Sequence, residues 1–114
     1  MDSLEIARAA SEAFRKIDPN IGAQTITVLL TIAQNDGRII VSDLERLCGL
    51  TRESASRNVK LLSGAKLKDG RHGYGLVEKR TSDQDDRVKI LSLTRTGQQV
   101  VQQILAAIGG NHAR

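Results

Sequence analysis

Apolar residues recur at helical spacing in four stretches of the chain: residues 3–17, about 19–35, 52–63 and 95–109. In each stretch they follow the i, i+3, i+4, i+7 pattern by which one face of a helix packs against a core. The chain is therefore predicted to be mainly helical. The positions expected to face inward are, in chain order, Leu4, Ala7, Ala10, Phe14, Ile17, Ile26, Leu29, Leu30, Ala33, Ala55, Val59, Leu62, Val100, Val101, Ile104, Leu105 and Ile108.

Turn-forming and capping residues mark where these helices begin and end. Asp18-Pro19 predicts the end of the first helix and the start of the second, because aspartate favours N-cap positions and proline favours the first helical turn. Ser42 and Glu45 have the spacing of a capping box, in which the serine accepts a hydrogen bond from the start of the helix and the glutamate reaches back. This predicts a short additional helix, which Gly49 ends.

Two further patterns predict strands. Residues 38–41 include three β-branched residues and follow the turn sequence at 35–37, so they predict a brief strand. Residues 76–80 and 88–93 predict the two strands of a hairpin, with the polar segment 81–86 as its turn. The predicted order is helix, helix, short strand, short helix, helix, hairpin, helix.

The two helices within 42–62, joined by a glycine-containing turn at 48–50, are typical of a helix-turn-helix. In that unit the second helix, here capped by Thr51, enters the major groove of duplex DNA, where arginine can bind guanine, glutamate can accept from cytosine and lysine can neutralise phosphate. An ordinary solvated face of an amphipathic helix is the alternative. The DNA-binding residues predicted in this unit are Ser42, Thr51, Arg52, Glu53, Ser54, Ser56, Arg57 and Lys60.

Charge is distributed unevenly along the chain. Residues 1–50 contain five Lys/Arg and seven Asp/Glu, whereas residues 51–95 contain eleven Lys/Arg and six Asp/Glu. A basic stretch of this kind suggests a face presented to a polyanion, although scattered solvated charges would give the same count. The glycine-rich segment 64–75, predicted to be a loop, and the hairpin supply the remaining candidate DNA contacts. These are Lys66, Lys68, Arg71, Arg87 and Lys89.

The hairpin sequence resembles the wing of the MarR family. That family has Gly-Leu-Val-x-Arg, then an acidic tip ending in Asp-Arg, then Leu-x-Leu-Thr-x-x-Gly. This chain has Gly-Leu-Val-Glu-Lys-Arg, Asp-Asp-Arg and Leu-Ser-Leu-Thr-Arg-Thr-Gly in the same order within residues 75–97. The segment from Val41 to Arg57 also resembles the family's helix-turn-helix. The resemblance extends over residues 21–108, and the wing motif is its most specific part.

The resemblance implies an α+β, mainly α fold, in which residues 1–114 form one winged helix-turn-helix domain with a two-stranded β-hairpin wing. It implies a winged unit over 21–93 and dimerisation helices at about 3–17 and 95–109. It further implies a dimeric bacterial or phage-type transcription factor, usually a repressor, on palindromic duplex DNA. Ser56 and Arg57 align with base-reading positions, and Arg87 aligns with the arginine that enters the minor groove.

The two terminal helices carry the predicted dimer interface. A homodimer would bury the apolar stripe of the last helix against the first helix of a partner, whereas in the alternative the stripe folds back on its own domain. The loop 64–75 is longer than is usual in the family, and the dimerisation region is shorter and almost without aromatic residues. A small-molecule effector is therefore doubtful. The predicted interface residues are Leu4, Ala7, Phe14, Val100, Val101, Ile104, Leu105 and Ile108.

Other classes of protein find little support in the sequence. Its 114 residues, 39% apolar, suit one domain, and no apolar run has the roughly 20 residues of a membrane helix. The single cysteine, Cys48, and the distant His72 and His112 predict no metal site, and we expect no cofactor and no enzymatic motif. A cytoplasmic, nucleoid-associated protein is expected. The main alternative function is a winged-helix module that binds protein in a replication or transcription assembly.

Overall fold

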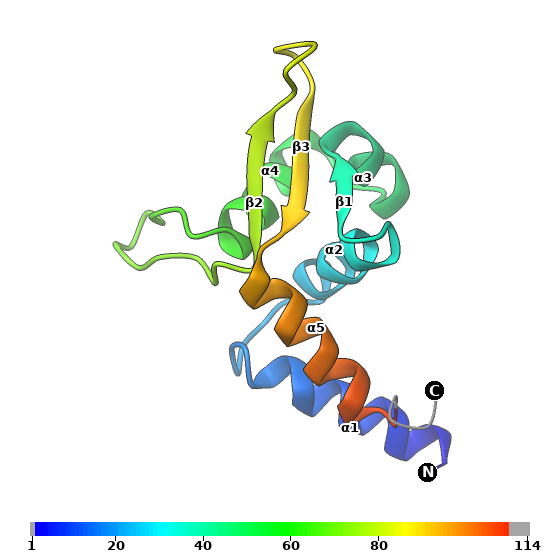
Figure 1. Ribbon diagram of the computed structural model, residues 1–114. Helices are drawn as coiled ribbons and strands as arrows, with labels where there is room; N and C mark the ends of the chain where they lie inside the picture. Colours follow the sequence, from blue (N-terminus) through cyan, green and yellow to red (C-terminus); the bar gives the residue numbers. More distant parts are fainter. Residues whose placement is uncertain (1, 110–114) are drawn as a thin grey trace.

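Helices and strands alternate along the chain in the predicted order (Figure 1). The computed structural model describes residues 2–109, and within them it contains five helices and one three-stranded antiparallel sheet. Their bounds are α1 (Ser3–Arg15), α2 (Ala23–Gln34), β1 (Arg38–Ile40), α3 (Val41–Cys48), α4 (Arg52–Leu62), β2 (Val77–Thr81), β3 (Lys89–Leu93) and α5 (Arg95–Ala107). This confirms the mainly α, α+β winged-helix fold.

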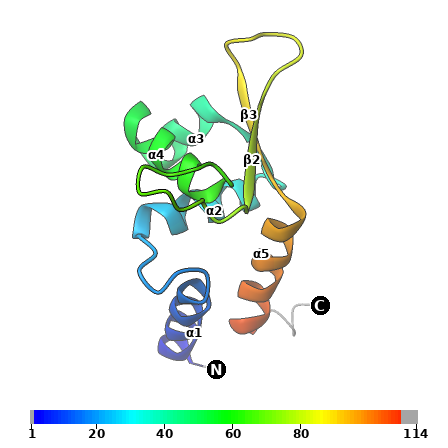
Figure 2. The same ribbon diagram turned by 90° about the vertical axis from the view of Figure 1, so that its left-hand side faces the viewer.

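The sheet lies beside the helices α2, α3 and α4, which cover one of its faces (Figure 2). The order of its strands is β1-β3-β2, so the wing hairpin β2–β3 gains a third strand that the predicted two-stranded hairpin lacked. Ile39 of β1 pairs with Leu91 of β3, and both side chains are buried. The base of the wing is therefore hydrogen-bonded to the segment that leads into the helix-turn-helix.

Helix α2 begins later than the sequence predicted, and its buried face differs from the predicted one. It starts at Ala23, because the Asp18 carboxylate accepts a hydrogen bond from the backbone N–H of Asn20 and the chain turns there instead. Thr25, Val28, Leu29 and Ile32 are buried, whereas the predicted Leu30 is 37% exposed. Apolar residues form a broad arc around this helix, so their periodicity alone could not define which part of the arc is buried.

The predicted capping box at the start of α3 does not form. Strand β1 runs directly into the helix, so Ile40 is the N-cap, without a side-chain hydrogen bond, and Ser42 lies inside the first turn. The other end is as predicted: Gly49 terminates α3 with a φ of 63°, in the left-handed region that glycine adopts without strain.

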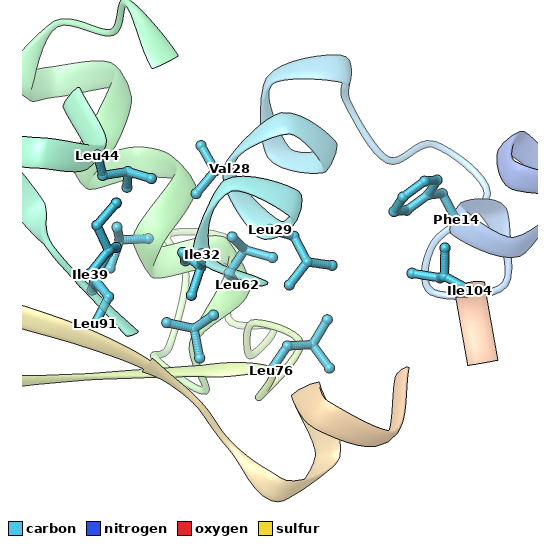
Figure 3. Packing of buried hydrophobic residues seen from close by; sticks show 12 residues of the cluster. Phe14, Val28, Leu29, Ile32, Ile39, Leu44, Leu62, Leu76, Leu91 and Ile104 are labelled. Atoms are coloured by element: carbon cyan, nitrogen blue, oxygen red, sulfur yellow. The ribbon is translucent and has the colours of Figure 1, made fainter. Parts of the chain in front are cut away.

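Helix α5 packs along α1 at the end of the molecule away from the wing (Figure 1). Phe14 and Ile104 are both buried within the one chain and lie together at one side of the core (Figure 3). The apolar stripe of α5 thus partly folds back on its own domain, which was the alternative to its use in a dimer.

Candidate nucleic-acid interface

Helix α4 is held against the core by its predicted inner face. Ala55, Val59 and Leu62 are all buried, and the hydroxyl of Thr51 accepts a hydrogen bond from the backbone N–H of Ser54 at 3.1 Å, as predicted for an N-cap. This packing directs the other face of α4 toward solvent. The exposed side chains on it are Arg52, Glu53, Ser56, Arg57 and Lys60.

A buried asparagine that sequence reasoning missed fixes α4 against α2. The Asn58 side-chain oxygen accepts a 2.7 Å hydrogen bond from the Thr25 hydroxyl, and its nitrogen donates to Gln24 and to the Ser54 carbonyl. Every polar atom of this amide therefore has a partner, which a buried amide requires. Asn58 sets the position of α4 and with it the position of the exposed face.

The exposed face of α4 and the wing enclose a groove of about 550 Å³. Arg52 and Ser56 of α4 and Ser42 of α3 line it on the helix side. The wing contributes three cationic side chains, of which Lys79 was not predicted because its position on an exposed strand face gave no signal. These three are Lys79, Arg87 and Lys89.

The two predicted cations of the wing are held by partners at the hairpin tip. The Arg87 guanidinium donates two hydrogen bonds, each 3.1 Å long, to the Asp85 carboxylate, while 90% of the Arg87 side chain remains exposed. These bonds, together with one from the Arg87 backbone N–H, hold the pKa of Asp85 below its ordinary value. Lys89 donates to the Thr81 hydroxyl and the Asp86 carbonyl. Both cations are thereby positioned at the surface.

A second groove, of about 840 Å³, lies between α4 and the loop 64–75. Arg57 and Lys60 line it from the helix, and the predicted Lys66 and Lys68 line it from the loop. The third predicted cation of the loop, Arg71, is not among its lining residues. The groove therefore brings together two parts of the predicted site that lie apart in the sequence.

Residues predicted for a dimer interface fall into buried and accessible groups. Phe14 and Ile104 are buried in the chain itself, and Val100, Val101 and Ile108 are half-buried. The accessible members, on α1 and α5, are Leu4, Ala7 and Leu105.

No cluster of three or more potential metal-binding side chains exists among residues 2–109, and no helix of that part is long and apolar enough to cross a membrane. His72 places its Nδ1 3.1 Å from the Gly64 carbonyl oxygen, whereas His112 lies outside the described residues. Cys48 is half-buried and donates to the Thr31 hydroxyl.

Solved structures with the same arrangement include Rv1404 from Mycobacterium tuberculosis, which is 23% identical, with a TM-score of 0.74 over 98% of this chain and 70% of that one. A mutant of E. coli MarR, complexed with operator DNA, is 18% identical, with a TM-score of 0.65 over 93% of this chain and 70% of that one. Reduced AbfR bound to DNA is 21% identical, with a TM-score of 0.64 over 95% of this chain and 72% of that one.

These likenesses define the class of the fold as a winged helix-turn-helix. Within that class, the fold is the one seen in MarR-family regulators, which confirms at the level of the fold the resemblance found in the wing sequence. No protein-family model and no curated protein sequence matches the chain.

Proposed function

We propose that the chain is a sequence-specific transcription regulator that binds duplex DNA. The observation that carries the proposal is the groove shared by the exposed face of α4 and the wing, in which four cationic side chains meet one carboxylate, that of Glu45. Two of the similar structures, those of MarR and AbfR, were determined with DNA bound.

In the proposed complex α4 enters the major groove, where base edges differ in their donors and acceptors. Arg57 and Ser56 contact base edges, and Arg52 and Lys60 contact phosphate. Glu53 is placed to accept a hydrogen bond from cytosine. The predicted contacts Ser42, Thr51 and Ser54 lie around the start of α4 and provide backbone-positioning hydrogen bonds.

The wing is proposed to follow the backbone and to place Arg87 in the adjacent minor groove. A narrow, A·T-rich minor groove has an enhanced negative potential that attracts arginine. Lys79 and Lys89, on the two strands of the wing, supply contacts to the phosphates that border it.

The regulator is proposed to act as a homodimer and as a repressor on a palindromic site. Helices α1 and α5 form the dimerisation part in this proposal, with Leu4, Ala7 and Leu105 at the contact. A twofold axis between two copies of α4 would match the symmetry of a palindrome, with half-sites about one helical turn apart.

A winged-helix module that binds protein would instead present apolar side chains on the outer face of α4. The exposed residues of that face are all polar or charged, and Leu61, which leans toward it, is half-buried. This composition favours the DNA-binding proposal.

Selection of bound duplexes from a random DNA pool tests the proposed function. We expect enrichment of a palindrome with an A·T-rich segment beside each half-site. Recovery of a pool with the same composition as the starting pool would refute sequence-specific binding, and an enriched asymmetric site would refute the symmetric homodimer.

A further inference from the structure

The loop between α4 and β2 is folded as a small hairpin, which we call the arm (residues 64–73). The backbone N–H of Leu67 donates to the Arg71 carbonyl, and that of Gly73 donates to the Ala65 carbonyl, at 2.7 and 2.9 Å. Figure 1 shows the arm projecting to the left from the end of α4, whereas the tip of the wing points upward. The arm and the wing are thus two separate projections that point in different directions.

The base of the arm is fixed tightly to the end of α4. A Cβ atom at Gly73 would overlap the Ser63 carbonyl oxygen, so only glycine allows this close approach. The next residue, Tyr74, donates its backbone N–H to the Leu61 carbonyl and its hydroxyl to the Asp18 carboxylate at 2.5 Å. The arm is therefore held in one orientation relative to α4.

The first half of the arm runs beside the exposed face of α4. Lys66 and Lys68 share the arm-side groove with Arg57 and Lys60 of that face. Arg52 and Ser56 line both this groove and the groove on the wing side, so α4 forms a ridge between two hollows.

The charges of the arm differ in their availability. The Arg71 guanidinium donates to the Asp69 carboxylate at 2.8 Å, and the hydrogen bonds from its backbone N–H and guanidinium hold the pKa of Asp69 below its ordinary value. Within residues 2–109, Lys66 and Lys68 form no ion pair, and both are exposed. The arm thus presents two lysines without an ion pair toward a groove that Glu53 and Asp69 also line.

We infer that the arm is a second element that binds the DNA backbone, opposite the wing. This inference rests on the proposed function, because a helix in the major groove has a phosphate backbone on either side. The wing covers one of these backbones. Lys66 and Lys68 bind phosphates of the other, so that the two projections hold the duplex across α4. These contacts carry no base information, so they add affinity equally for all sequences.

The double variant Lys66→Ala/Lys68→Ala tests the inference. Each lost phosphate contact lowers the slope of log affinity against log salt by about 0.9, so we expect a decrease of about 1.8 for each bound chain. Affinity should fall by the same factor for the selected duplex and for a scrambled one. The matched control, Lys16→Ala/Arg38→Ala, removes two exposed cations, at the C-cap of α1 and on β1, and should leave the slope unchanged.

Removal of the arm gives a second, independent measurement. Because the backbones of Ala65 and Gly73 are joined by a hydrogen bond, residues 66–72 can be replaced by a two-residue Asn-Gly turn. This replacement leaves the attachment of the arm to α4 in place. In phosphate-ethylation interference, this variant should lose the contacts on the strand away from the wing and keep those beside the wing.

The results separate this inference from the proposed function. If the wild-type chain selects a sequence but the lysine variant keeps the salt slope of its control, the arm does not bind DNA and the inference is wrong. An unchanged interference pattern in the shortened variant leads to the same conclusion. If the wild-type chain selects no sequence, both the proposed function and the arm inference fail.

Discussion

The two arginines proposed to read DNA lie in different surroundings. Arg57 is exposed on α4, where its guanidinium donates a 3.3 Å hydrogen bond to the Ser54 hydroxyl. Arg87 is held by both oxygens of Asp85 at the tip of the wing. Their substitutions should therefore have different consequences.

Replacement of Arg57 by alanine should relax the choice of one base pair in each half-site. A bidentate contact between arginine and guanine discriminates against other bases by roughly 1–3 kcal/mol, and this preference would disappear. Arg57→Lys is the matched control, because it keeps the charge and loses the bidentate geometry. Both Arg57→Ala and Arg57→Lys should lose the preference for that base pair when affinities are measured for the selected site and for its single-base variants. Unchanged base preference in both variants contradicts a base-reading role.

Replacement of Arg87 by alanine should weaken binding to many sequences and reduce any preference for A·T-rich flanks, because the minor groove distinguishes mainly A·T from G·C. The alternative role for Arg87 is to stiffen the hairpin through Asp85. An exposed ion pair of this kind contributes little to stability. Under that alternative, titrations against flank variants would show unchanged affinity, and thermal unfolding would show a small loss of stability.

The sequence predicted the exposed face of α4 well but not the residue that positions it. Ala55, Val59 and Leu62 define a helix face by their spacing, so the opposite face followed from geometry. Asn58 lies on the buried side, yet a polar residue in an amphipathic pattern gives no sign of burial. Its partners Thr25 and Gln24 belong to another helix, and only the packed structure brings them together.

At the scale of elements, one hydrogen bond joins the segment between α1 and α2 to the end of α4. Burial and the bond to the Asp18 carboxylate raise the pKa of Tyr74 to about 12. The same bond, together with one from Asn20, lowers the pKa of Asp18. Two distant segments are therefore connected by a bond that requires the protonated phenol and the ionised carboxylate.

The Tyr74→Phe variant should have a lower free energy of unfolding than the wild type near neutral pH, as measured by urea unfolding. Because the folded pKa of Tyr74 is raised, its stabilisation is complete below pH 10.0 and is lost as the pH rises through about 12. Because the folded pKa of Asp18 is lowered, its stabilisation is present above pH 3.8 and is lost as the pH falls through that lowered value. The difference between the two proteins should therefore disappear at both extremes. A difference that is independent of pH contradicts the bond.

The limits of helices were predictable where local chemistry sets them. Thr51 and Thr94 cap the helices that follow, and Gly49 ends α3, since each depends on a few adjacent residues. The capping box at Ser42 was wrong because β1 continues into α3 without a break. That continuity depends on the pairing of β1 with β3, a partner far along the chain, which no local pattern specifies.

At the scale of the whole molecule, the proposed dimer depends on side chains that one chain leaves uncovered. Leu4 is 83% exposed and Leu105 is 43% exposed, whereas Ile104 is buried. Substitution of Ile104 would therefore perturb the fold itself. Leu105 is the residue of α5 that can report on association.

Leu105→Asp should convert the proposed dimer into a folded monomer. Light scattering measures the change in mass, and circular dichroism checks that the variant is folded. Burial of a leucine side chain at an interface contributes roughly 1.5–3 kcal/mol, and an aspartate there would be left without a partner. Ala106→Asp places the same charge on a neighbouring exposed position of α5 and should remain dimeric. Light scattering that shows a wild-type monomer contradicts the proposed homodimer.

The overall fold was predictable because the wing motif and the helix spacing agree with each other. The position of the arm beside α4 could not be predicted from the sequence. Residues 64–75 carry four glycines, a composition that predicts a loop and specifies no direction. Only contacts such as that of Gly73 with the end of α4 place Lys66 and Lys68 beside that helix.

The pairing of Ile39 with Leu91 also bears on how readily the length of the chain between β1 and β3 can change. It closes a loop of roughly fifty residues, and the arm lies inside that loop. The entropy of closure changes only with the logarithm of loop length, so the presence of residues 66–72 alters it by about 0.1 kcal/mol. An insertion at this point is nearly neutral for folding. The arm can therefore be lengthened or shortened at its tip while α4 and the wing keep their places.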